Sequence, residues 1–346
     1  MTYEATPFEV DMQAQPDALR ELSGRLDLGS LSTFAARNWD RIVITGMGSS
    51  YCAGHPTWRS LANNTTPVWE IDTSQLLDTP EVLQGRSLVI ATSQSGESGE
   101  IVRLLEMRRS GKLQFAGLIG ITEARLSTLA SEADLFIPLG SGSEATVSTK
   151  SYLNSLAIHR LLSAAFTGIP VGKVEEELLE TILGVETLLR TLNLEGFATK
   201  ALLPQKPRVV MVGRLDDAAT SIYAGLITKE AAKIPAEGFV GGQFRHGPFE
   251  LAGPNLSAIF FESSHGEGTN VYEKLITDLI ETGSQVLIVG GNAVTGASHI
   301  PLGSISTLSR LCSGAVISQV LALNLGRVNG VTPGKFIYGS KVTTLI

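Results

Sequence analysis

The sequence predicts an α/β fold built from two similar, doubly wound parallel sheets. Short apolar runs typical of buried strands alternate with segments of helical periodicity, which favours βαβ units and a parallel sheet. The plan of the first half of the chain is then repeated in the second half. The repeated order indicates two domains of the same kind.

The strands are expected in the same order in both halves. In the first half they are DRIVITGMGSSYCAG (40–54), which ends in a glycine turn and a helix start, then SLVIATSQSGES (87–98) and QFAGLIGIT (114–122). In the second half they are PRVVMVGRLDDAATSIYAG (207–225), LSAIFFESSHGEG (256–268) and SQVLIVGG (284–291). In both halves the second strand ends in hydroxyl side chains.

These runs give the expected domain boundaries. We expect a lead-in helix over 1–30, a first domain over 31–170, a second domain over 201–330 and a tail over 331–346. Between the domains, GKVEEELLETILGVETLLRTLNLEGFATKA carries leucines at a period of three to four with acids between them, which predicts a linker helix over 171–200.

Composition excludes several classes of function. The 346 residues are 43% hydrophobic and 18% charged, and the net charge of −7 with no basic cluster argues against nucleic-acid binding. Cys52 and Cys312 are too far apart in sequence to indicate a disulfide framework or zinc site, and the five histidines show no paired metal-ligand spacing. No signal peptide or membrane-spanning run is visible, so we expect a cytoplasmic protein that does not bind membranes.

Serines are concentrated at the junctions between the first two predicted strands and the helices that follow them. Ser93, Ser95 and Ser98 follow the second strand, and Ser49 and Ser50 follow the first. A helix amino terminus attracts anions, and serine hydroxyls add neutral donors, so these junctions predict a phosphate site. Helix capping is the alternative explanation for any one serine, but five together favour an anion. No nucleotide cofactor is expected, because GMGSSY lacks the third glycine of a dinucleotide fingerprint.

Several motifs resemble the tandem sugar isomerase (SIS) domain family. They are ITGMGSSYCAG, SQSGESGE, EATVSTKSYLNSLA, GGQFRHGPFELAG and GSKVTTLI, and together they resemble the isomerase half of the glucosamine–fructose-6-phosphate aminotransferases. The resemblance implies two flavodoxin-like SIS domains, the first of which binds a sugar phosphate. It implies that the phosphate is held by Ser49, Ser50, Ser93, Gln94, Ser95 and Ser98, and that Ser148 touches the sugar.

The resemblance also implies two residues of the proton chemistry. Glu230 stands sixteen residues before His246, as the proton-transferring glutamate of the family does, and would move a proton between C1 and C2 of the sugar. Without the resemblance, the preferred interpretation of Glu230 is a solvated glutamate on a helix. His246, in FRHGP, would open the sugar ring and would come from the neighbouring subunit, which implies a homodimer.

Lys341 is the third catalytic candidate. A lysine amine on a tail can attack a ketose carbonyl and form an imine, and the resemblance places Lys341 where the imine-forming lysine of the family stands. Without the resemblance, a surface lysine beside a tail strand is the preferred interpretation.

Departures from the family leave several functions open. Ile227 stands where the family synthase has a lysine, Tyr223 replaces an acidic residue, and these residues include no glutaminase domain. We therefore expect not a complete glutamine-dependent synthase but an isomerase or deaminase of a ketose or amino-sugar 6-phosphate. The alternatives are a fructosyl-amino-acid 6-phosphate deglycase and a sugar-phosphate-binding regulator without turnover.

Overall fold

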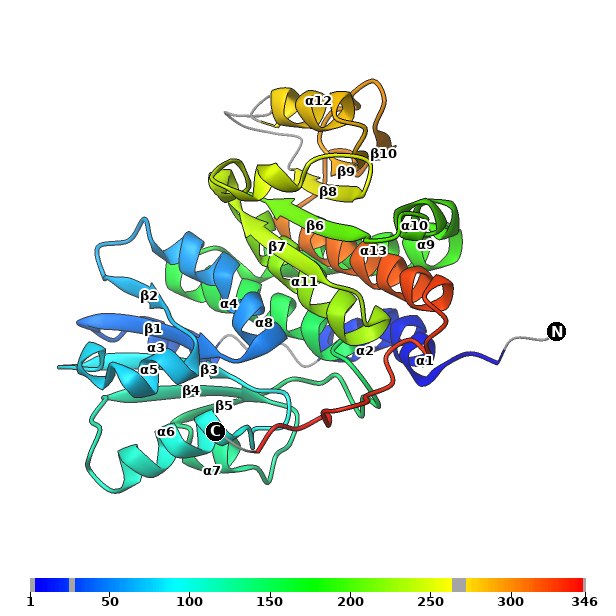
Figure 1. Ribbon diagram of the computed structural model, residues 1–346. Coiled ribbons are helices and arrows are strands. Elements are labelled where there is room, and N and C mark those ends of the chain that lie inside the picture. Colours follow the sequence, from blue (N-terminus) through cyan, green and yellow to red (C-terminus); the bar gives the residue numbers. More distant parts are fainter. Residues whose placement is uncertain (1–3, 25–28, 263–271, 345–346) are drawn as a thin grey trace. The chain divides into compact units, whose positions relative to one another are not determined.

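The computed structural model describes residues 4–24, 29–262 and 272–344, which form two compact units (Figure 1). The first unit comprises Ala14–Leu178 and Phe336–Ile346, and the second comprises Met1–Gln13 and Leu179–Lys335. The amino-terminal segment therefore belongs to the second unit, and the carboxyl-terminal segment belongs to the first. The order of segments along the chain does not reveal this exchange.

The first unit is built on a parallel sheet with the order β2-β1-β3-β4-β5. Its strands are β1 (Arg41–Gly46), β2 (Val68–Glu70), β3 (Ser87–Thr92), β4 (Gly117–Thr122) and β5 (Leu135–Pro138). Every residue of β3 and β4 is buried, which fits strands covered by helices on both faces. The chain leaves β1 first toward β2 and later toward β3, so the sheet reverses its order between β1 and β3.

Helices cover both faces of this sheet. The helices are α2 (Gln15–Ser23), α3 (Gly29–Ala35), α4 (Gly48–Leu61), α5 (Thr73–Asp78), η1 (Pro80–Val82), α6 (Gly99–Arg109), α7 (Thr128–Glu132) and α8 (Lys150–Thr167). One core joins the sheet to α5, α6 and α7 through residues such as Val89, Leu104 and Leu129. On the other face α4 packs on α8, and α2 and α3 pack against α8 in turn.

The second unit repeats the design with the sheet order β10-β9-β8-β6-β7, again all parallel. Its strands are β6 (Arg208–Gly213), β7 (Ala236–Val240), β8 (Leu256–Glu262), β9 (Gln285–Gly290) and β10 (Ser298–Ile300). The predicted strands and their order are therefore confirmed in both halves. The hydroxyl residues expected after β8, Ser263 and Ser264, lie outside the described residues.

The second sheet is also covered on both faces. Its helices are α1 (Pro7–Gln13), α10 (Glu195–Leu202), α11 (Asp217–Ala232), η2 (Gly241–Arg245), η3 (Pro248–Leu251), α12 (Glu273–Glu281) and α13 (Thr307–Val328). One core joins the sheet to η2 and α12 through Phe244, Phe260 and Leu279. On the other face α11 packs along α13, and α1 contacts α13 with an ion pair between Glu9 and Arg327.

The linker between the two sheets is interrupted. It comprises α9 (Val171–Thr191) and α10, with a break at Leu192–Leu194 in place of one continuous helix. The side chain of Asn193 accepts a hydrogen bond from the amide of Glu195 at 2.8 Å. An asparagine that binds the backbone two residues onward favours a turn, which explains why the helix restarts here.

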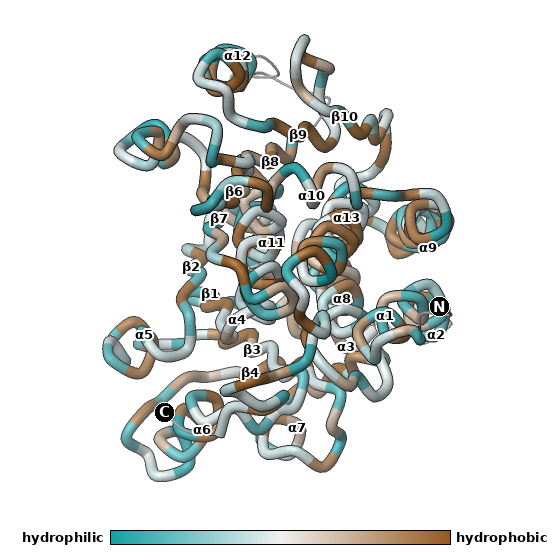
Figure 2. Tube along the Cα trace, turned by 45° about the vertical axis from the view of Figure 1, so that its right-hand side comes forward, coloured by the Kyte–Doolittle hydropathy of each residue, from teal (hydrophilic) through white to brown (hydrophobic). Residues whose placement is uncertain are grey.

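Helix α13 corrects one expectation from the sequence. Among the described residues it is the one helix long and apolar enough to cross a membrane by length and composition, although no such run was expected. Most of its apolar window is buried inside the protein, and Figure 2 shows the apolar colour along much of it. This burial is typical of the core helix of a globular unit.

Leu88 tests how strongly the central strand β3 depends on its buried side chains. Leu88 is fully buried, whereas Leu126 in the same unit is 99% exposed. Leu88→Ala should lower the free energy of unfolding by about 2–5 kcal/mol because it leaves a cavity. Leu126→Ala should change it by less than about 0.5 kcal/mol. Urea unfolding followed by circular dichroism measures both, and equal losses would contradict this packing.

Candidate functional site

The predicted phosphate residues gather at the carboxyl edge of the first sheet. Gly46 at the end of β1 pairs in register with Thr92 at the end of β3, so the two following loops lie side by side. Ser49 and Ser50 occupy the first turn of α4, and Ser93 begins the loop that leads to α6. Open α/β sheets bind ligands at this point, where the strand order reverses.

The serine side chains in the second loop do not cap α6. Ser98 is the residue before α6, but its side chain makes no capping hydrogen bond. Its hydroxyl lies 3.4 Å from that of Ser93, which in turn accepts a hydrogen bond from the amide of Gly96 at 3.1 Å. The Ser95 hydroxyl accepts from the amide of Glu97 at 3.1 Å. The hydroxyls of Ser93, Ser95 and Ser98 therefore lie within one short loop between β3 and α6.

Gly96 makes this loop tight. Its φ is +66°, and a Cβ atom there would lie 2.2 Å from the Ser127 hydroxyl oxygen, so a side chain does not fit. The carbonyl of Gly96 accepts from the amide of Leu129 at 3.2 Å, and the carbonyl of Gln94 accepts from that of Glu123 at 3.1 Å. The loop is therefore fixed to the loop after β4. Gln94 lies half-buried at its start.

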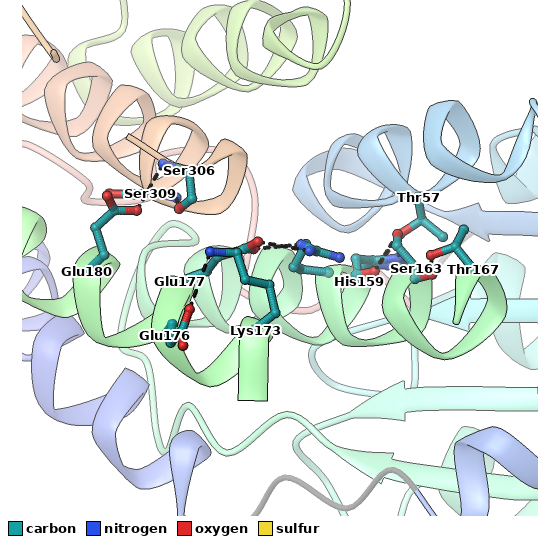
Figure 3. Close-up of polar contacts among 11 residues, drawn as sticks. Thr57, His159, Ser163, Thr167, Lys173, Glu176, Glu177, Glu180, Ser306 and Ser309 are labelled. Carbon is teal, nitrogen blue, oxygen red and sulfur yellow. Dashed lines mark hydrogen bonds and ion pairs between the residues drawn. The ribbon is translucent and has the colours of Figure 1, made fainter. Parts of the chain in front are cut away.

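A buried histidine supports the end of β3 (Figure 3). The hydroxyl of Thr57 donates to the backbone carbonyl of His159 at 2.9 Å and also lies 3.0 Å from its ring Nδ1. The Thr57 hydroxyl proton is already donated to the backbone carbonyl, so the ring Nδ1–H must donate to the Thr57 oxygen. The ring Nε2 is then unprotonated and accepts a hydrogen bond from the Thr92 hydroxyl at 3.0 Å. Burial lowers the pKa of His159 to about 3, so the ring is neutral. No pattern in the sequence predicts this role for His159.

The tail brings Lys341 to the same unit. Its ammonium lies 2.5 Å from a carboxylate oxygen of Glu144, which opens the loop that holds Ser148. Two residues further on, the carbonyl of Thr343 accepts from the amide of Gly99, the first residue of α6, at 3.0 Å. The tail therefore contacts both the Ser148 loop and the start of α6.

The other two catalytic candidates belong to the second unit and lie apart within it. Glu230 is half-buried in the last turn of α11, six residues before β7, and its carbonyl accepts from the Lys233 side chain. His246 is exposed and follows η2 after the other end of β7. The ends of this strand are roughly 13 Å apart. The structure does not bring these two side chains together within the second unit.

The residues that depart from the family pattern belong to the core of the second unit. Ile227 and Tyr223 are buried on α11, and the Tyr223 hydroxyl accepts from the Gln319 amide of α13 at 3.0 Å. An apolar residue at 227 therefore fits its surroundings, where an uncompensated lysine would be costly to bury.

The equivalent edge of the second sheet is charged rather than hydroxyl-rich. Asp217, the first residue of α11, is buried and pairs with Arg310. Burial, and then the charge of Asp217, raises the pKa of Glu262 at the end of β8 to about 7. Carboxylates here oppose an anion, whereas in the first unit the first turn of α4 carries no acid and that of α6 carries Glu100, which is not buried. The phosphate is therefore expected in the first unit.

The described residues contain no cluster of metal-binding side chains, and a cavity in the first unit lies away from the predicted site. No group of three or more His, Cys, Asp or Glu side chains able to hold a metal ion occurs within the described ranges 4–24, 29–262 and 272–344. A cavity of about 440 Å³ opens at the other end of the first sheet, where its lining includes Ile42 and Val68 near the starts of β1 and β2, with Arg37 and Trp39. No predicted site residue lines it.

Comparison with known proteins identifies the class. Residues 36–165 match the family model described as the SIS domain, so the chain contains a SIS domain. Over 321 residues it is also 27% identical to glutamine–fructose-6-phosphate aminotransferase [isomerizing] from Mycolicibacterium smegmatis. The match covers 88% of this chain and 51% of that protein, so the chain spans about half the length of this relative and resembles its isomerase part.

Solved structures share the fold of the whole chain. The C-terminal domain of glucosamine-fructose-6-phosphate aminotransferase from Francisella tularensis superposes with a TM-score of 0.83 at 19% identity, covering 96% of this chain and 99% of that one. Tagatose-6-phosphate ketose/aldose isomerase from Escherichia coli superposes with a TM-score of 0.78 at 20% sequence identity, and the match covers 97% of each chain. Glucosamine-6-phosphate deaminase from Thermotoga maritima superposes with a TM-score of 0.74 at 19% sequence identity. The match covers 97% of this chain and 99% of that one. The two units are doubly wound SIS folds.

Ser95 should contribute directly to anion binding. Ser95→Ala should weaken the affinity for glucosamine 6-phosphate by about 10- to 100-fold, the loss expected for one hydrogen bond to a charged group. Isothermal titration calorimetry measures it. Ser131→Ala removes an exposed hydroxyl on α7 that donates to the Thr128 carbonyl, and it should leave the affinity unchanged. An unchanged affinity in both variants would remove Ser95 from the site.

His159 should make the stability depend on pH. Its pKa is about 3 in the folded protein against an ordinary 6.5, so the unfolded chain binds the extra proton between these values. The free energy of unfolding should be highest above pH 6.5 and fall below it by up to about 1.4 kcal/mol per pH unit for this proton. Denaturant unfolding at pH 7 and 5 should show a smaller decrease for His159→Gln. Equal decreases would contradict the assignment.

Proposed function

We propose that this protein is an enzyme that acts on a ketose or amino-sugar 6-phosphate, by aldose–ketose isomerisation or by deamination. One observation carries the proposal. The tail joins a hydroxyl-lined junction at the switch point of the first sheet to a loop where Lys341 pairs with Glu144. The proposed phosphate site and the lysine amine would then belong to one unit. The names of the similar proteins, which include a deaminase and an isomerase of sugar phosphates, agree with this chemistry.

The serines would anchor the phosphate while the reaction takes place at the other end of the sugar. Ser49, Ser50, Ser93, Ser95 and Ser98 with Gln94 offer hydroxyl and amide donors, and the loop after β3 is held in place by Gly96. Binding energy from a group that does not react can be used to position the reacting atoms. Ser148 would contact the sugar from the neighbouring loop.

Lys341 would hold the sugar carbon C2. In its unprotonated form the amine adds to a ketose carbonyl, and loss of one water leaves an imine. An imine withdraws electrons from the neighbouring carbon, which makes the transfer of a proton between C1 and C2 easier. In the deaminase reaction, water replaces the amine of glucosamine 6-phosphate, and fructose 6-phosphate and ammonium result.

Glu230 would transfer the proton and His246 would open the ring. These side chains lie at opposite ends of β7, which supports a contribution of His246 from a second copy of the chain and hence a homodimer. Ile227 stands on α11 where the family has a lysine, and an isoleucine cannot transfer a proton. Glu230 would therefore carry out the proton transfer without help from position 227.

The second candidate is a deglycase for fructosyl-amino-acid 6-phosphates. It is favoured by the buried Ile227, because such an enzyme is expected to work with the glutamate and the histidine alone. The position of Lys341 next to the Ser148 loop favours the ketose reaction instead. A regulator without turnover is less favoured, since it would need neither Lys341 nor Glu230. Location in the cytoplasm stays a prediction from the sequence.

Proton exchange tests the function directly. The protein is incubated with glucosamine 6-phosphate in D₂O, and the C2 proton of the sugar and free ammonium are followed by NMR. We expect loss of the proton and release of ammonium, with both rates falling at least about 1,000-fold in Glu230→Gln, because the base is removed. Sugar-phosphate binding should persist in that variant.

The controls separate the candidate reactions. Glu237→Gln neutralises an exposed carboxylate on the adjacent strand and should keep wild-type rates. Proton exchange without ammonium would indicate isomerisation without C–N cleavage. If neither signal changes, fructosyl-amino-acid 6-phosphates become the substrates of choice, and the isomerase and deaminase proposals are rejected.

A further inference from the structure

Glu144 is a buried acid whose role the proposed mechanism leaves open. It lies in SEATVSTKS, four residues before Ser148, and its side chain has no exposed surface. Its carboxylate accepts from the amide of Thr149 at 2.7 Å and the hydroxyl of Thr149 at 3.0 Å. It also accepts from the amide of Ser151 at 3.1 Å and the hydroxyl of Ser151 at 2.6 Å. Four donors from one short segment therefore converge on one carboxylate.

The fifth donor is Lys341, at 2.5 Å, and it comes from the other end of the unit's sequence. Burial raises the pKa of Glu144, but the ammonium of Lys341 and the surrounding donors outweigh it and leave the pKa below its ordinary value. Glu144 therefore remains a carboxylate. A buried charge of this kind needs its partner, because removing the opposite charge from a buried pair is strongly destabilising.

Among the described residues 336–344, two polar contacts join the tail to the rest of the first unit. Ile337 is 60% exposed and Tyr338 is fully exposed, so apolar burial does not hold these positions. Beyond Lys341, the Thr343 carbonyl accepts from Gly99 at the start of α6. This amide belongs to the first turn of a helix, where a backbone N–H has no partner within the helix and donates to an acceptor outside it. The ion pair is the stronger of the two contacts.

We propose that Glu144 is a positioning residue that anchors the tail through Lys341 and so holds the lysine amine beside the Ser148 loop. The same carboxylate fixes the backbone on both sides of that loop, so one side chain sets the geometry of the sugar contact and of the amine together. The anchoring itself is independent of any substrate. Its catalytic consequence rests on the proposed function, in which Lys341 forms an imine.

Hydrogen exchange at Gly99 tests the anchoring without a substrate. The Gly99 amide is protected by the Thr343 carbonyl, so its exchange reports whether the tail is bound. In Glu144→Gln we expect Gly99 to exchange faster by about tenfold or more, because the buried ion pair is lost. The amide of Val102, which donates to the Ser98 carbonyl inside α6, should keep its rate. NMR of the labelled protein measures both amides.

A double-mutant cycle shows whether Glu144 acts through the lysine. Lys341→Gln leaves the buried carboxylate and its loop donors in place and should expose Gly99 as Glu144→Gln does. The double variant should be no worse than either single one, since both remove the same contact. Lys335→Gln, which removes an exposed charge six residues before Lys341, should have no effect. Unchanged exchange at Gly99 in both single variants, or additive effects, would overturn the proposal.

Imine trapping then tests the catalytic consequence. Wild-type protein is treated with fructose 6-phosphate and sodium cyanoborohydride, which reduces an imine to a stable secondary amine that mass spectrometry detects on the Lys341 peptide. We expect Glu144→Gln to be labelled about tenfold more slowly at equal sugar-phosphate affinity, since positioning is lost and the serines are unchanged. Equal labelling rates would overturn the positioning role. If wild type binds the sugar without labelling, the imine proposal fails, and the Gly99 result still decides the anchoring.

Discussion

The amide groups that begin a helix need acceptors, and this requirement governs both units of the protein. In the first unit, α4 and α6 begin next to serine hydroxyls, and the Thr343 carbonyl of the tail takes the amide of Gly99. In the second unit, α11 begins with the buried carboxylate of Asp217, paired with Arg310. The first turn of α4 thus offers neutral donors and no acid, whereas α11 begins with a fixed negative charge.

Buried polar side chains then hold these helix starts in place by two different physical means. His159 is kept neutral and supports the end of β3 through hydroxyl groups, so its burial needs no counter-charge. Glu144 is kept charged, and its burial depends on five donors, one of which is a lysine from the tail. The first arrangement is a rigid support beneath the site. The second includes a partner from the tail, so under the proposed positioning role it connects the tail to the chemistry.

The division of the candidate residues between units shapes the proposed chemistry. The phosphate residues, Ser148 and Lys341 belong to the first unit, while Glu230 and His246 occupy opposite ends of β7 in the second. Ile227 and Tyr223 are part of the packed core of α11, so the loss of the family lysine is accommodated by apolar packing. A reaction that depends on one lysine on the tail agrees with the deaminase proposal, whereas the deglycase proposal needs only the glutamate and the histidine.

The sequence by itself determined three strands of each sheet, their order along the chain and the serine-rich junctions, because buried parallel strands and helix starts leave strong local patterns. It did not predict β2, β5, β7 and β10. It also contained Glu230, His246 and Lys341 as candidates, whose roles stay predictions. Only the tertiary structure decided that the two chain ends change places between the units, that His159 lies beneath Thr92 and that Glu144 meets Lys341. These facts depend on contacts between residues far apart in the chain. A lone acid in a serine loop and a core histidine look ordinary until their distant partners are known.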